Sequence, residues 1–162
     1  MKRVLVVSMS ILLIGVIVAI GWAQAKKAVT LPKDWRTYKH IGSLIITDKA
    51  NALFGIHHFY MNKTGLDAFN KGMPYPDGTI IVDTVYDVVA SPDGKMLNEG
   101  KMLFMPYMKK NAKAAETKET GGWIFAAFAP EGKQIEKDPK KDCFECHAAV
   151  KDSDYVFSKP LK

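Results

Sequence analysis

Apolar and polar positions alternate along five stretches of the chain, which are rich in Ile, Val, Tyr and Phe. Alternation with a period of two predicts β-strands. Turn signals lie beside two of these stretches, as Asp77-Gly78 and as Ser91-Pro92-Asp93-Gly94. The strands that we expect cover residues 43–47, 53–61, 79–89, 101–108 and 123–128.

Helical signals are few and short. They lie near Pro32–Trp35, over residues 65–71 and 111–117, and around a cysteine motif at 143–147. Successive strands with few helices predict an α+β fold, built as an antiparallel β-sheet with a few short helices, the C-terminal one carrying the cysteine motif. A four-helix bundle does not fit so β-rich a chain.

The first 25 residues have the order of a secretory signal peptide. Lys2 and Arg3 precede an apolar run over residues 4–20, and Ala23-Gln24-Ala25 offers small residues at a cleavage site. The alternative is an uncleaved membrane anchor, because the run approaches the length that spans a bilayer. We therefore expect export to the periplasm, a signal peptide over residues 1–25 and one domain over residues 26–162, with membrane attachment only if the segment is uncleaved.

The formal net charge is +6, and removal of Lys2 and Arg3 lowers it by two. The lysines are spread along the chain, often near acids, and no basic stripe interleaved with aromatic residues occurs. This pattern argues against a nucleic-acid partner. A basic face could help the protein meet an acidic redox partner, although solvated lysines explain the same charge.

Both cysteines of the chain lie in the motif Cys143-Phe144-Glu145-Cys146-His147. Two thiols at this spacing reach the two vinyl groups of one haem, and the following histidine can then bind the iron from below. The pattern C-x-x-C-H is the attachment signal of c-type haem. We therefore expect one covalently bound haem c, with Cys143 and Cys146 as its anchors and His147 as the proximal iron ligand.

Two other readings of the motif remain open at this stage. A disulfide between Cys143 and Cys146 would close a very small loop and would stabilise the fold little, so it would act as a redox centre rather than as a structural cross-link. Such a centre usually lies at a helix start after an early strand. Zinc would need about four ligands, and the sequence has no second pair of cysteines to complete the set.

The motif lies near the C-terminal end of the sequence, unlike that of ordinary small electron-carrier cytochromes. Those carriers attach haem near the N-terminus and use a downstream methionine as the sixth ligand. Residues 148–162 contain neither methionine nor histidine. Any residue on the distal side of the iron must therefore come from upstream.

Several segments in one order resemble the family of cytochrome P-460 and cytochrome c-prime-beta. They are Leu31-Pro32-Lys33-Asp34-Trp35-Arg36, the strand around residues 56–61, Pro76-Asp77-Gly78-Thr79, Gly121-Gly122-Trp123, the C-x-x-C-H motif and the tail Asp154-Tyr155-Val156-Phe157. The resemblance covers nearly all of residues 26–162. It implies a homodimer built on an antiparallel sheet, His147 as proximal ligand, and a distal pocket lined from the sheet.

One position bears on the branch of that family. Hydroxylamine-oxidising members carry a lysine joined covalently to the haem edge, and gas-binding members lack it. In our register this position is Asp83, and no lysine occurs between Lys71 and Lys95. The resemblance is therefore closer to the branch without the cross-link.

Strand alternation sorts the distal candidates. His57, Phe59 and Met61 should share one face of their strand, with His58 on the other. By the family register His57 would share the haem face with Asp83, and Phe59 would act as an apolar cap. His57 could serve as a general acid–base group, could bind the iron itself, or could simply be a hydrogen-bonded edge residue.

Methionines are the other soft ligands upstream. Met102 and Met108 should share one face of their strand and Met105 the opposite face, and all three also suit the role of core filler. We predict a haem protein that binds a small ligand such as nitric oxide, with peroxide as a further reactant. The alternatives are a hydroxylamine-oxidising enzyme and a six-coordinate electron carrier, so oxidoreductase activity is left open.

Overall fold

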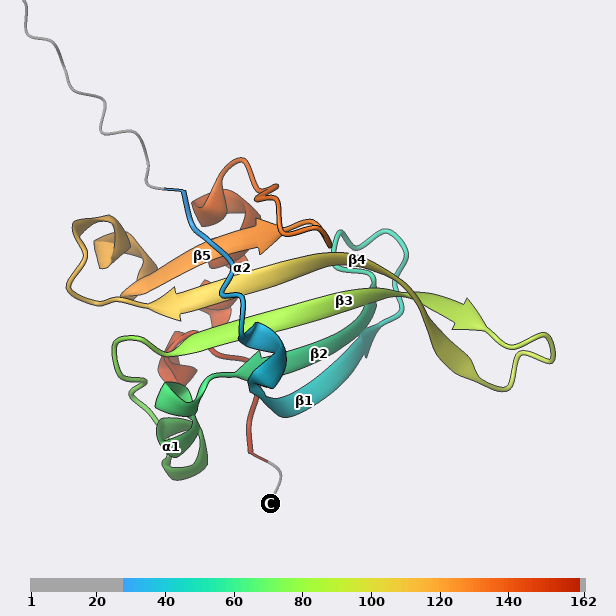
Figure 1. Cartoon of the computed structure of the whole chain (residues 1–162), viewed down its shortest axis with the longest axis horizontal. Coiled ribbons are helices and arrows are strands. Elements are labelled where there is room, and N and C mark those ends of the chain that lie inside the picture. Colours follow the sequence, from blue (N-terminus) through green and yellow to red (C-terminus); the bar gives the residue numbers. More distant parts are fainter. Residues whose placement is uncertain (1–27, 161–162) are drawn as a thin grey trace, which may run out of the picture.

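The computed structural model describes residues 28–160, which form one five-stranded antiparallel sheet with strands in sequential order (Figure 1). The α+β prediction is confirmed. The predicted signal peptide falls outside the described residues. The strands are β1 (Lys39–Ile46), β2 (Gly55–Met61), β3 (Ile80–Ala90), β4 (Leu97–Lys110) and β5 (Trp123–Phe128).

The helices are short, and some of them lie over the faces of the sheet. In α1 (Lys63–Lys71), the side chain of Asn62 caps the first turn by accepting from the Gly65 N–H at 3.3 Å. The C-terminal segment is a continuous helical run of three pieces. The remaining helices are η1 (Trp35–Thr37), η2 (Ala115–Thr120), η3 (Lys140–Phe144), α2 (Glu145–His147) and η4 (Ala148–Ser153).

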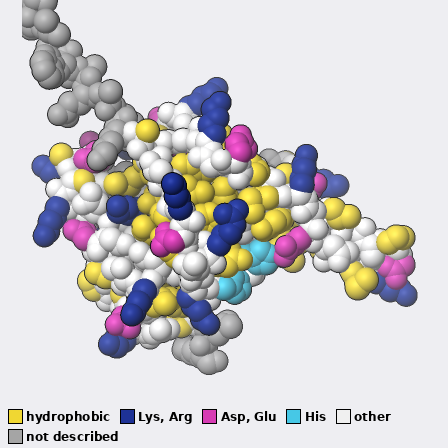
Figure 2. Space-filling model, viewed as in Figure 1, with side chains coloured by type: hydrophobic (Ala, Val, Ile, Leu, Met, Phe, Trp, Pro, Cys, Tyr) yellow, Lys and Arg dark blue, Asp and Glu magenta, His cyan; other side chains and the backbone are white. Residues whose placement is uncertain are grey.

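The sheet buries both of its faces, because a different segment covers each one. The N-terminal segment crosses the face seen in Figure 1, and the C-terminal helices lie behind the sheet. Hydrophobic side chains gather over the sheet in the same view (Figure 2). We call the face under the N-terminal segment the front face and the other the rear face.

Each face has its own hydrophobic cluster. The front cluster contains Trp35, Val82, Met105, Tyr107, Ala126 and Phe128. The rear cluster contains Ile41, Met61, Phe69, Tyr75, Ile81, Met108, Trp123, Phe125 and Val156. Cys143 and Phe144 pack against the rear cluster. The cysteine motif therefore lies over the rear face.

The pairing of β3 with β4 is irregular, and this changes the expected methionine pattern. Val85 pairs with Phe104, whereas the next residue, Tyr86, pairs with Met102, so β4 contains one extra residue at this point. An extra residue reverses the alternation beyond it. Met102 packs against the front cluster with Met105, and only Met108 belongs to the rear cluster. The prediction that Met102 and Met108 share a face is wrong.

Within residues 28–160 we find no helix with the length and apolar character needed to span a membrane.

Candidate functional site

The two cysteines lie in the C-terminal helical run, with Cys143 half-buried and Cys146 exposed, and both are free thiols. Burial, aided by the nearby carboxylates of Glu136 and Asp142, raises the pKa of Cys143 to about 12. A redox-active cysteine needs a lowered pKa, because the thiolate is the nucleophile. The surroundings of Cys143 therefore disfavour a catalytic disulfide centre.

The zinc alternative also lacks support. Across residues 28–160, no three side chains of His, Cys, Asp or Glu are grouped so that they could hold a metal ion. A structural zinc site is normally closed by four such ligands. The described part of the chain therefore offers no zinc site around Cys143 and Cys146.

His147 is held in a single tautomer by the backbone. Its Nδ1–H donates to the carbonyl oxygen of Tyr155 at 2.7 Å, so Nε2 carries the lone pair. The rings of Phe125 and Phe157 lie 5.0 and 5.1 Å from the imidazole, measured between ring centroids. Burial lowers the pKa of His147, which favours the neutral form. A neutral imidazole oriented by a carbonyl is the usual form of a metal-binding histidine.

Asp154 fixes the segment that supplies this carbonyl. It adopts a left-handed conformation with φ 48° just before Tyr155. Its Oδ1 lies 2.5 Å from the Nζ of Lys110, and its Oδ2 accepts from the backbone N–H of Tyr75 at 2.9 Å. Trp123 donates from Nε1 to the Asp154 carbonyl oxygen at 2.9 Å. Bonds to three separate elements therefore hold the chain beneath His147.

His57 and Asp83 meet on the rear face, where they are 2% and 8% exposed. His57 Nδ1 lies 2.7 Å from Asp83 Oδ2, and His57 Nε2 lies 2.7 Å from the carbonyl oxygen of Leu53. Pairing of β2 with β3 places Phe59 directly opposite Asp83. The His57 and Phe59 rings are stacked with centroids 6.2 Å apart. The structure thus brings together the three distal candidates of the sequence.

The Leu53 carbonyl determines how protons are placed in this pair. A carbonyl oxygen only accepts, so His57 Nε2 must carry a proton. The contact between Nδ1 and Oδ2 then needs one further proton, which belongs either to the imidazolium or to the carboxylic acid. In both arrangements the pair shares one proton and has no net charge.

The pKa shifts of the pair agree with this arrangement. Burial opposes the charged form of His57, but the hydrogen bond and charge of Asp83, with the Leu53 carbonyl, outweigh it and raise its pKa. Burial raises the pKa of Asp83, against the opposing influence of His57. Both groups therefore retain protons more readily than in water.

Asp83 has a second oxygen without a partner. Its Oδ1 is buried and accepts no hydrogen bond within the described part of the protein. Such an atom normally costs about 1–3 kcal/mol unless a partner is supplied. An orphaned acceptor on the face that the cysteine motif covers is what a site for an additional polar group would contain.

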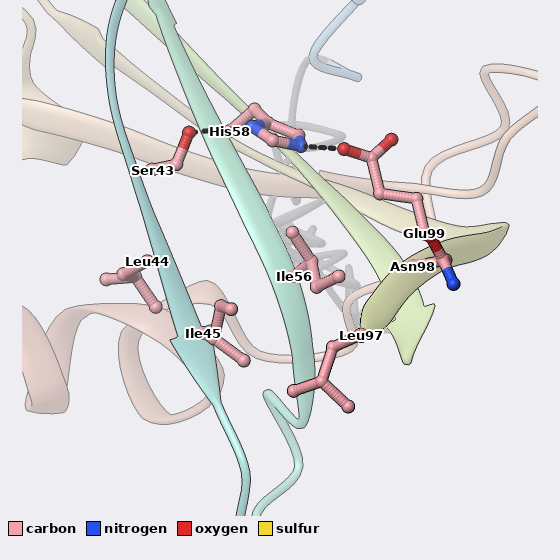
Figure 3. A pocket seen from close by; sticks show the side chains of 8 residues that line it. All are labelled: Ser43, Leu44, Ile45, Ile56, His58, Leu97, Asn98 and Glu99. Atoms are coloured by element: carbon pink, nitrogen blue, oxygen red, sulfur yellow. Dashed lines mark hydrogen bonds and ion pairs between the residues drawn. The ribbon is translucent and has the colours of Figure 1, made fainter. Parts of the chain in front are cut away.

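His58 lies on the front face, as strand alternation predicts for the neighbour of His57. Its Nδ1 is 2.7 Å from Ser43 Oγ, and its Nε2 is 2.6 Å from Glu99 Oε1 (Figure 3). Ser43 Oγ also lies 2.9 Å from His40 Nε2. Apolar side chains such as Leu97 line the groove beside this network. The sheet separates the groove from the cysteine motif.

The model of the family described as Cytochrome P460 matches residues 32–158. The chain belongs to the cytochrome P460 family. A search of curated proteins finds no match for it. Membership means that this is a c-type haem cytochrome, and the residues present fit a haem. Two free thiols precede an imidazole with its Nε2 lone pair available, and the orphaned Asp83 oxygen lies on the same face of the sheet.

For this family member, sequence reasoning missed the groups that orient the site. They are the carbonyl oxygens of Leu53 and Tyr155 and the anchoring carboxylate of Asp154. Backbone carbonyls have no residue-type signal. Asp154 belongs to the tail that resembles the family, but its anchoring role has no sequence signal beyond the tolerance of Asp for the left-handed conformation.

Proposed function

We propose that this chain is a periplasmic monohaem cytochrome c that binds a small ligand, such as nitric oxide, at an open distal site. One observation carries the proposal. His57 is the histidine placed on the rear face by β2, and both of its nitrogens are already hydrogen-bonded. Binding the iron would cost it the Leu53 or the Asp83 bond.

The haem is attached through thioethers to Cys143 and Cys146, with His147 Nε2 as the proximal ligand. The Tyr155 carbonyl supports this role, because it holds Nε2 unprotonated. When bound, the haem supplies an iron with one coordination position open to a small ligand, and a reversible change of oxidation state. Phe59 supplies an apolar cap beside that position and limits the access of water.

His57 and Asp83 are the proton-handling groups of the site. The pair already holds one proton between Nδ1 and Oδ2, and that proton can move between the two residues without a change in net charge. A second proton from a reactant such as peroxide would leave both groups protonated. This capacity supports reactivity toward peroxide, and with it an oxidoreductase activity.

The alternatives receive less support. In our register Asp83 falls at the position of the cross-linking lysine, and it is engaged with His57; both points argue against hydroxylamine oxidation by the cross-linked branch. Met108 is 6% exposed within the rear cluster, and no described feature directs its sulfur toward His147. Neither His57 nor Met108 therefore offers the free sixth ligand that a six-coordinate electron carrier needs.

The remaining parts of the proposal concern the surroundings of the protein. The leader-like sequence supports export by residues 1–25, the family resemblance supports a homodimer, and the basic charge supports a redox partner protein. Size-exclusion chromatography with light scattering of the mature protein tests the dimer, and N-terminal sequencing of the exported protein tests cleavage after Ala25.

The optical spectrum of the reduced protein, recorded with and without nitric oxide, tests the central proposal. We expect a five-coordinate spectrum that changes on addition of nitric oxide. A six-coordinate, low-spin spectrum with no nitric oxide uptake would overturn it. Peptide mapping after acid–acetone extraction tests attachment: haem should remain on the peptide with Cys143 and Cys146, and a link to any lysine would favour the hydroxylamine-oxidising branch.

A further inference from the structure

Asp83 combines three properties that single out its Oδ1, an atom that the proposed function does not use. The residue is 8% exposed, its Oδ2 is occupied by His57, and its Oδ1 is buried without a partner among the described residues. Its neighbours along β3 on the same face, Ile81 and Val85, are apolar and buried. The free oxygen therefore lies between two apolar neighbours on its own strand.

The tautomer of His57 defines what Oδ1 can do. Because the Leu53 carbonyl oxygen accepts a hydrogen bond from the Nε2–H of His57, the shared proton of the pair lies between Nδ1 and Oδ2. Oδ1 is then unprotonated, either as part of a carboxylate or as the carbonyl oxygen of a neutral acid. In both cases it can accept a hydrogen bond and cannot donate one.

We propose that Asp83 Oδ1 is the specificity-determining acceptor of the distal site, and that it favours hydroxylic ligands, hydrogen peroxide in particular, over diatomic gases. This inference rests on the proposed function, since it needs an open distal position. Nitric oxide and carbon monoxide have no proton to donate, so they leave Oδ1 unpaired. A ligand with an O–H group satisfies it.

The same oxygen can take the proton of peroxide. The O–H bond of the peroxide breaks, its proton bonds to Asp83 Oδ1, and the electron pair stays on the peroxide oxygen. The proton already shared with His57 then remains on Nδ1, so the pair changes from neutral to a charge of +1 while the peroxide gains a charge of −1. His57 is a positioning residue here, because it holds Asp83 and accepts the shared proton.

Two variants separate accepting a hydrogen bond from accepting a proton. In Asp83→Asn, the amide N–H can donate to His57 Nδ1, which leaves the amide oxygen in the place of Oδ1 but without basicity. Asp83→Val removes both functions. Thr84→Val is the matched control, because Thr84 is the next residue of β3, is 1% exposed and faces the other side of the sheet.

The experiment uses the full haem-loaded mature protein and three measurements. Optical titrations give the affinity of the reduced protein for carbon monoxide and of the oxidised protein for hydroxylamine, a hydroxylic probe. Stopped-flow mixing gives the second-order rate with hydrogen peroxide. Folding of each variant is checked by its thermal transition and by its haem content.

We expect carbon monoxide affinity to stay the same in all variants. Hydroxylamine affinity should fall by about 10- to 100-fold in Asp83→Val, as for the loss of a hydrogen bond to a charged group, and by less in Asp83→Asn. The peroxide rate should fall by about 100-fold or more in both, since both lack the base. Thr84→Val should match the wild type.

The inference is overturned if Asp83→Val lowers hydroxylamine and carbon monoxide affinity equally, or if Asp83→Asn keeps the wild-type peroxide rate. An equal effect of Thr84→Val would also overturn it, because the cause would then be the fold of β3. Wild-type protein that takes up neither carbon monoxide nor nitric oxide would instead refute the proposed function.

Discussion

The Nδ1–H of His147 donates to the carbonyl oxygen of Tyr155 across 2.7 Å, eight residues along the chain. This bond turns the C-terminal segment back under the motif, and it leaves Nε2 as the free nitrogen. The orientation of the proposed proximal ligand therefore depends on how firmly the chain at Asp154 and Tyr155 is held.

Gly121→Ala should displace Tyr155, whose carbonyl oxygen orients His147. Gly121 has φ 63°, and a Cβ at this position would overlap the ring of Tyr155. The left-handed conformation costs alanine about 1–2 kcal/mol, and overpacking adds about 1–3 kcal/mol. We expect a lowered free energy of unfolding by urea denaturation, together with a changed spectrum of the reduced haem.

Gly94→Ala is the matched control for that variant. Gly94 also has a left-handed φ of 70°, but nothing lies within 4 Å of the Cβ that alanine would add. Its free energy of unfolding should fall only by the cost of the left-handed conformation, and it should keep the wild-type spectrum. Equal losses in the two variants would show that the Tyr155 ring moves aside freely.

Asp154→Asn should destabilise the protein through Lys110. The side chains of this ion pair are 9% and 13% exposed, and their atoms are 2.5 Å apart. Asparagine keeps the left-handed preference at φ 48° but leaves the ammonium group without a counter-charge. Breaking a buried pair in this way costs about 3–5 kcal/mol, which urea denaturation of the haem-loaded protein would measure.

The double variant Lys110→Met with Asp154→Asn completes a thermodynamic cycle. Removing both charges should restore part of the lost stability, because no buried charge remains unpaired. The exposed pair of Lys140 and Glu119 provides a comparison, and Glu119→Gln should have no measurable effect. If the losses of stability in Lys110→Met and Asp154→Asn simply added up in the double variant, the ion pair would have no coupling energy.

The His57–Asp83 pair should make stability fall as pH rises. Both pKa values are raised in the folded state, so the folded protein binds protons more tightly than the unfolded chain. The contribution of His57 is complete below its ordinary pKa of 6.5 and is lost as pH rises through the folded value. The slope is at most about 1.4 kcal/mol per pH unit, measured by urea denaturation between neutral and alkaline pH.

Asp83→Asn should reverse this behaviour. A buried His57 that faces an amide has no negative partner, so burial then lowers its pKa and stability falls toward acidic pH. Thr84→Val should keep the wild-type profile. An unchanged pH profile in Asp83→Asn would show that the shared proton does not contribute to folding.

Cys146→Ala should leave haem bound through Cys143 alone. Each thioether saturates one vinyl group, so the variant should keep its colour after acid–acetone extraction and show a reduced pyridine haemochrome band at longer wavelength than the wild type. Removing both thiols should release the haem into the acetone. Colour retained by the double variant would reveal another covalent link.

Alternating polarity predicted the five strands in their correct order, because side chains in a half-buried strand obey a period of two. The last strand, at residues 123–128, was predicted with its observed bounds. The first four residues of β1 and of β4 were not predicted, because Lys39–Gly42 and Leu97–Gly100 have weak apolar patterns. Their pairing depends on neighbouring strands, which a local pattern does not contain.

By itself the sequence determined the sheet, the C-x-x-C-H motif and the opposite orientations of His57 and His58, since each depends on local spacing. Only the tertiary structure decided that Leu53 and Tyr155 orient the two histidines, and that Asp83 keeps one oxygen free. These carbonyls lie only four and eight residues from the histidines that they contact, but the contacts arise from the path of the folded chain. The extra residue in β4 that turns Met102 to the front face likewise becomes visible only when the two strands pair.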